Sequence, residues 1–131
     1  MTLIENKSKM DKVFKPIGAS NHVAADRAED DYYATDPIAI DKLLKVESPY
    51  LKIWECACGE GHLSKRLEER GYTVKSSDIV DRGYGQVCDF LKSEGVGHWD
   101  IITNPPYKYA KEFILHALDI VEAGSNIYIC F

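Results

Sequence analysis

The chain has 131 residues, an ordinary length for one small domain, and 45% of them are apolar, which is enough for a buried core. Its formal net charge is −5, from 16 basic and 21 acidic residues, so no strong overall field attracts nucleic acid and any such contact needs a local patch. No run approaches about 18 consecutive apolar residues, and the first residues lack the apolar region of a signal peptide. We therefore expect a cytoplasmic protein of one domain.

The four cysteines support that location. Cys56, Cys58, Cys88 and Cys130 include no C-x-x-C spacing, and all lie in or beside apolar runs. This pattern predicts reduced, buried thiols rather than zinc ligands or disulfides.

Residues 1–31 mix charged and small side chains without a sustained period, and Pro16 and Gly18 interrupt them. Such a segment has little periodic apolar surface to bury, so it predicts an irregular arm. We expect the folded core to span residues 32–131.

A helix start follows the arm. Thr35 or Asp36 is suited to be the N-cap, and Pro37 suits the first helical position because its missing N–H costs nothing there. Apolar residues then recur at helical spacing, which predicts a helix over 37–46. The spacing alone favours a plain helix cap over a binding role for these three residues.

The next pattern is strand, glycine turn, helix. Residues 51–56 predict a buried strand, and Gly59 and Gly61 break it before a helix that Gly71 ends. The two glycines would let a ligand approach the backbone, and the N–H groups near His62 would face the same place. A lone Gly-x-Gly is nevertheless most often only a tight turn.

Acidic residues follow the next two predicted strands. Asp78 comes after the strand 72–77, and Asp89 comes after the short strand 85–88. An acid in the position of Asp78 receives ribose hydroxyls in doubly wound nucleoside-binding folds. Because the glycine run is shorter than G-x-G-x-x-G, the pattern favours a nucleoside without a pyrophosphate over a dinucleotide.

The fourth predicted strand, 99–103, ends in a rigid turn formed by Asn104, Pro105, Pro106 and Tyr107. The two prolines fix φ near −65° and cannot continue a central strand, so they set the direction of the side chains around them. The Asn104 amide cannot change charge near neutral pH, and Tyr107 offers a flat face. Together they suit a planar ring that bears an NH2 group. The alternative is that the prolines only end the strand and Tyr107 is a surface aromatic.

A helix over 111–121 and a strand over 126–131 complete the pattern. Strands that alternate with helices predict an α/β fold, a mostly parallel sheet of about five strands with helices on both faces. The carboxyl ends of parallel strands meet at one edge, where we expect Glu55, Asp78, Asp89 and Asn104.

With these residues assembled, the chain resembles the S-adenosylmethionine-dependent methyltransferases of exocyclic amines, among them the adenine-specific DNA methyltransferases. The residues Asn104, Pro105, Pro106 and Tyr107 match the family's catalytic motif, and Glu55 to Gly61 is similar to its cofactor loop, with Glu55 where Asp is commoner. The resemblance implies a Rossmann-like class I methyltransferase fold and S-adenosyl-L-methionine as cofactor. The cofactor-binding residues it implies are Thr35, Asp36, Pro37, Glu55, Cys56, Ala57, Gly59, Gly61, Asp78, Ile79, Asp89, Phe90 and Asn104.

Within the resemblance, each segment receives one part of the cofactor. Asp78 corresponds to the ribose-binding acid, Asp89 and Phe90 to the adenine-binding motif, and the segment from Thr35 to Pro37 to the motif that touches the methionine end.

The implied substrate is an adenine flipped out of DNA. Asn104 and the Pro105 carbonyl would accept the hydrogens of its amine, and Tyr107 would stack on the base. The same motif occurs in methyltransferases of RNA bases and of protein glutamine, which stay as alternatives, although the Thr-x-Pro segment favours DNA adenine.

The chain ends after its fifth predicted strand and lacks the last two strands and the target-recognition region of that family. A truncated, inactive relative that only binds the cofactor is therefore a further alternative. Residues 126–131 would also form an exposed apolar edge, which predicts self-association through this strand.

Overall fold

The computed structural model describes residues 2–4, 32–95 and 97–130. Its strands are β1 (Thr2–Ile4), β2 (Lys52–Glu55), β3 (Thr73–Asp78), β4 (Gln86–Val87), β5 (Asp100–Thr103) and β6 (Ile127–Ile129). Its helices are α2 (Ile38–Leu44), α3 (His62–Glu69) and α4 (Ala110–Ile120), with short 3-10 turns η4 (Phe90–Lys92) and η5 (Tyr107–Tyr109). Among the described residues, no helix is long and apolar enough to cross a membrane.

The strands form one sheet in the order β1-β6-β5-β2-β3-β4. The five strands from β2 to β6 pair in parallel, and β1 pairs antiparallel with β6. The predicted α/β fold with a mostly parallel sheet of about five strands is confirmed. The strand order reverses between β2 and β5, because the chain first builds outward through β3 and β4 and then returns to the other side of β2.

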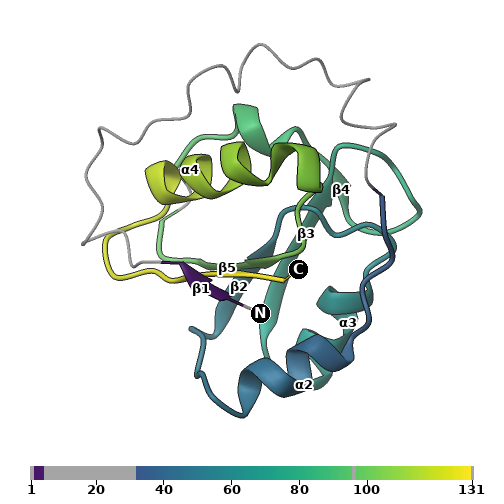
Figure 1. Ribbon diagram of the computed structural model, residues 1–131, viewed down its shortest axis with the longest axis vertical. Helices are drawn as coiled ribbons and strands as arrows, with labels where there is room; N and C mark the ends of the chain where they lie inside the picture. The colour runs from purple at the N-terminus through teal and green to yellow at the C-terminus, as the bar shows by residue number, and fades with distance from the viewer. Residues whose placement is uncertain (1, 5–31, 96, 131) are drawn as a thin grey trace.

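Helices cover both faces of the sheet, as predicted (Figure 1). Successive side chains of a strand point to opposite faces. Ile53 of β2 therefore packs with Leu63 of α3 on one face, and Trp54 packs with Phe113 of α4 on the other. This alternation places α2 and α3 below one continuous sheet and α4 above it (Figure 1).

A buried carboxylate joins the sheet at the opposite edge from the predicted site. Asp100, at the start of β5, is 1% exposed and accepts the backbone N–H of Tyr50 at 2.8 Å and of Asn126 at 2.9 Å. It thereby ties the segments that lead into β2 and β6 to the strand between them. The sequence pattern did not signal this role.

The boundaries of the helices differ from the predictions by one or two residues, as is usual at fraying ends. The helix predicted over 37–46 is α2, and the one predicted over 111–121 is α4. The segment after Asp89 forms only the 3-10 turn η4. The predicted strand 126–131 is paired over Ile127–Ile129.

The outer edge of β6 is where the expectation from sequence is wrong. We expected its backbone to be unpaired, but β1 pairs with it, Thr2 opposite Ile129 and Ile4 opposite Ile127. Residues 2–4 are therefore extended rather than irregular, while 5–31 lie outside the described residues. The unpaired N–H and C=O groups of an edge strand can form hydrogen bonds with another extended segment. Here that segment is β1 of the same chain. At these three positions β6 therefore has no unpaired backbone edge through which a second copy could pair.

Candidate active site

A cleft with about 780 Å³ of empty space, partly open to solvent, lies at the carboxyl edge of the sheet. Its wall includes Glu55 at the end of β2, Asp78 at the end of β3 and Asn104 just after β5. This is the position where the strand order reverses, the usual place for a ligand in an open α/β sheet.

Most of the predicted site residues meet at this cleft. Those on its wall are Thr35, Glu55, Cys56, Ala57, Gly59, Asp78, Ile79, Phe90, Asn104, Pro105, Pro106 and Tyr107.

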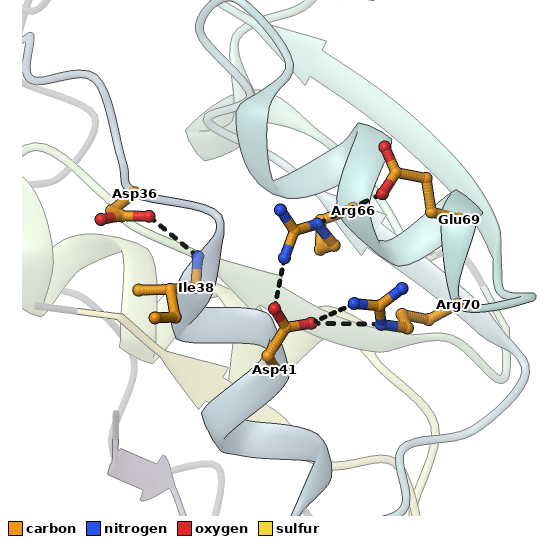
Figure 2. A network of polar contacts seen from close by, with 6 residues as sticks. All are labelled: Asp36, Ile38, Asp41, Arg66, Glu69 and Arg70. Atoms are coloured by element: carbon orange, nitrogen blue, oxygen red, sulfur yellow. Dashed lines mark hydrogen bonds and ion pairs between the residues drawn. The ribbon is translucent and has the colours of Figure 1, made fainter.

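Two predicted site residues instead serve the local backbone. The Asp36 carboxylate accepts the N–H of Ile38 at 3.0 Å and so caps α2 (Figure 2), and the Asp89 carboxylate accepts the N–H of Leu91 at 3.1 Å and caps η4. Neither lies on the cleft wall as the structure describes it, and the same holds for Pro37 and Gly61. Asp side chains commonly accept hydrogen bonds from the N–H groups at a nearby helix start, which accounts for both contacts.

Glu55 is a carboxyl group buried at the centre of the site, with 2% of its surface exposed. One oxygen, Oε1, accepts both the Thr103 hydroxyl and the backbone N–H of Ala57, the latter at 3.0 Å. Burial raises the pKa of Glu55 to about 7, the charge of Asp78 adds to the rise, and the two hydrogen bonds oppose it. A positive group placed beside Glu55 would favour the ionised form.

Asp78 holds the glycine loop against β3. Its Oδ2 accepts the N–H of Gly59 at 2.9 Å, and its Oδ1 accepts the N–H of Val80 at 3.1 Å. The neighbouring backbone bond from the N–H of Cys58 to the carbonyl of Ser77, at 2.9 Å, strengthens the junction. Each carboxylate oxygen keeps further accepting capacity, so a ligand hydroxyl still finds an acceptor there.

The two glycines have backbone conformations that other residues rarely adopt, with φ of +54° at Gly59 and +90° at Gly61. The sequence suggested that a ligand approaches them closely, but the chain's own rings do so in the structure. A Cβ on Gly59 would lie 2.7 Å from Cε1 of Tyr32, and one on Gly61 would lie 2.6 Å from Cδ2 of Tyr84. The backbone of Gly61 thus packs directly against the Tyr84 ring, where a side chain would clash.

Sequence reasoning missed Tyr32 and Arg82 on the cleft wall. The Tyr32 hydroxyl donates to Oε1 of Glu60 at 2.6 Å, and Cζ of Arg82 lies 3.7 Å from the centre of the Tyr32 ring. Burial and the bond to Glu60 raise the pKa of Tyr32. Nε of Arg82 is buried without a hydrogen-bond partner among the described atoms. The available signal was the aromatic pair directly before Ala34 and Thr35.

The Asn104 turn contacts the segment before α2. Nδ2 of Asn104 donates to the Thr35 hydroxyl at 2.9 Å. The rings of Tyr33 and Tyr107 lie 5.7 Å apart at an interplanar angle of 37°, and both are more than half exposed. Pro105 is buried, so the turn is anchored on one side and presents Tyr107 on the other.

Helix α2 holds this segment in place through a network of ion pairs with α3. Asp41 receives Nη1 of Arg66 on one oxygen, and on the other it receives Nη2 and Nε of Arg70 at 2.8 and 3.1 Å (Figure 2). Nε of Arg66 also lies 3.3 Å from Glu69. The network ties the helix that follows Thr35 to the helix that follows the glycine loop.

The cysteines are free thiols, as predicted. Cys56, Cys58 and Cys130 are buried, and Cys88 is half-buried. Burial raises the pKa of Cys56 well above its usual range and that of Cys58 to about 12, so both stay protonated near neutral pH. Within 2–4, 32–95 and 97–130, no three His, Cys, Asp or Glu side chains form a group that could hold a metal ion.

No protein-family model matches the chain, and no curated protein matches it at a significant level. The residues of the cleft therefore carry the functional inference. Their chemistry is a buried carboxyl, a loop-bound carboxylate, a neutral amide in a rigid turn, and exposed aromatic rings.

Proposed function

We propose that this protein is an S-adenosylmethionine-dependent methyltransferase that transfers a methyl group to the exocyclic amine of adenine in DNA. One observation carries the proposal. The rigid turn from Asn104 to Tyr107 borders the same cleft as Glu55, the Gly59 loop and Asp78. One cavity thus contains a neutral amide that could bind an amine and carboxylates that could bind a cationic nucleoside. The parallel sheet supports assignment to the class I methyltransferase fold.

The cleft residues fit the cofactor chemically. S-adenosylmethionine would supply an electrophilic methyl group on a positively charged sulfur. The buried Glu55 carboxyl suits a cationic group, and Asp78 keeps accepting capacity for ribose hydroxyls. Phe90, the aromatic residue that the resemblance places beside the adenine, borders the cleft.

In this proposal the chain activates the amine by position and electrostatics. An amino group conjugated to a ring is a poor nucleophile. Oδ1 of Asn104 and the Pro105 carbonyl would accept its two hydrogens, which favours a more tetrahedral nitrogen with an available lone pair. Tyr107 would stack on the base after it leaves the duplex. The S–C bond would break as the N–C bond forms, the sulfur would leave as a neutral thioether, and the methylated nitrogen would then lose one proton to water, so no titrating general base is required.

The test is transfer of tritiated methyl groups to unmethylated DNA, to RNA and to a protein extract. We expect labelled adenine in DNA and no transfer by Asn104→Ala, because the variant loses the amide oxygen that orients the amine. Asn126→Ala, the same substitution at the opposite edge of the sheet, is the matched control and should keep its activity.

The other outcomes separate the alternatives. Transfer to RNA or to protein glutamine would replace DNA as the substrate. Cofactor binding without any transfer would indicate an inactive cofactor-binding relative. If folded protein gives neither calorimetric heat nor a thermal shift with S-adenosylmethionine, the cofactor does not bind and the proposal is refuted.

A further inference from the structure

Residues 32–35 run across the mouth of the cleft and contact three separate parts of it. Tyr32 lies over Gly59 and bonds to Glu60. Tyr33 meets the ring of Tyr107, and Thr35 accepts a hydrogen bond from Asn104. The glycine loop therefore receives Tyr32, whereas Tyr33 and Thr35 both contact the turn that would hold the acceptor. Resemblance alone places Thr35 on the cofactor.

In the observed contact between Thr35 and Asn104 the amide nitrogen is engaged and the amide oxygen remains available. A side-chain amide is planar, with its oxygen and nitrogen on opposite sides of Cγ. Because Nδ2 is engaged by Oγ1 of Thr35 at 2.9 Å, Oδ1 points away from Thr35. The reverse orientation would present an NH2 group to the NH2 group of an acceptor, and two donors cannot form that hydrogen bond.

A second hollow lies next to the cleft, and residues 33–35 border both. Residues common to both walls are Tyr33, Ala34, Thr35, Asn104 and Tyr107. The second hollow continues toward α2, past the exposed Ile38 and the side chain of Lys42. Thr35 thus lies between two spaces, one bordered by Glu55 and Asp78 and one bordered by exposed aromatic side chains.

We propose that Thr35 is a positioning residue that holds the Asn104 amide with Oδ1 turned toward the acceptor amine. The Thr35 side chain then contributes to the acceptor part of the site through Asn104. This inference rests on the proposed function, in which Asn104 receives the amine.

The test compares Thr35→Val, which keeps the shape but loses the accepting oxygen, with Thr35→Ser, which keeps the hydroxyl. We expect Thr35→Val to lower kcat roughly ten- to hundredfold, as a misdirected reacting group does. The dissociation constant for S-adenosylmethionine should stay within about twofold, since the amide rather than the cofactor is affected. Thr35→Ser should restore most of the rate. Loss of cofactor affinity in Thr35→Val with kcat unchanged would overturn the assignment.

A second readout does not depend on activity. The chain has few side-chain amides, those of Asn6, Asn21, Gln86, Asn104 and Asn126, so their signals in an 15N–1H spectrum can be resolved. The pair that disappears in Asn104→Ala belongs to Asn104. Thr35→Val should shift that pair and leave the Asn126 pair in place, and Thr35→Ser should leave both near their original positions. Unchanged Asn104 signals in Thr35→Val would overturn the contact. If the full chain methylates nothing, the proposed function fails. The Asn104 amide signals would then still show whether Thr35 contacts Asn104.

Discussion

The buried carboxyl of Glu55 makes stability depend on pH in a direction opposite to that of most acidic side chains. Replacing it by Gln removes the ionisation with little change in shape. Both hydrogen bonds end on one oxygen, Oε1, so the amide oxygen of Gln can still accept from Thr103 and from the N–H of Ala57. The substitution therefore isolates the effect of the charge.

The sign and size follow from the pKa of Glu55. Burial raises it from 4.5 to about 7, so the folded state holds its proton more tightly than the unfolded chain does. Between pH 4.5 and about 7 the folded state carries more protons, and the free energy of unfolding falls as pH rises. A shift of this size corresponds to about 3 kcal/mol once both states are ionised, and to no cost where both are protonated.

The measurement is urea unfolding of the parent and of Glu55→Gln at pH 5, 6, 7 and 8. Other titrating groups are common to both proteins, so only the difference between the two curves matters. We expect the Gln variant to be more stable by about 1 kcal/mol at pH 5, where the unfolded chain is already mostly ionised, and the difference to grow to about 3 kcal/mol at pH 8. Glu122→Gln, at an exposed carboxyl, is the control and should follow the parent.

Two parallel curves for the parent and Glu55→Gln would refute the reasoning, because they would mean that the carboxyl is hydrated in the folded state. A Gln variant whose stability falls progressively below that of the parent as pH rises would show that the ionised group is paired with a positive charge.

Three further predictions address the glycine loop, the helices and the sheet edge. Asp78→Ala should weaken S-adenosylmethionine binding by ~1.5–3 kcal/mol in calorimetry, since charge-assisted bonds are lost; unchanged affinity would remove Asp78 from the site. Asp41→Ala should lower the free energy of unfolding by about 1 kcal/mol, a small value because its ion pairs with Arg66 and Arg70 are partly exposed. The loss should shrink in high salt, and a loss that salt leaves unchanged would argue against an electrostatic origin. Deleting residues 1–4 should uncover β6 and promote self-association in sedimentation, whereas a deletion variant that stays monomeric at high concentration would show that the edge is protected in another way.

Much of the fold was predictable because its causes are local. Apolar runs in the strands and the helical spacing of apolar residues need only a few neighbouring positions, so the order of strands and helices follows from them. The turn at Pro105 and Pro106 and the left-handed glycines are likewise set by the allowed φ of single residues. The carboxyl ends of parallel strands must share one edge, which brought Glu55, Asp78 and Asn104 together.

The partners of individual side chains depended on the tertiary structure. Thr35 and Asn104 are 69 positions apart, and no periodicity reports that one hydroxyl meets one amide. Asp36, Asp78 and Asp89 are all carboxylates at or beside the end of a regular element, yet Asp36 and Asp89 cap the turns that follow them and Asp78 holds the glycine loop. A sequence pattern thus determines which backbone conformations and which burial are favourable over a few residues. Which acceptor a donor reaches, and how strongly burial raises the pKa of Glu55, depends on the packing of segments that are distant in the chain.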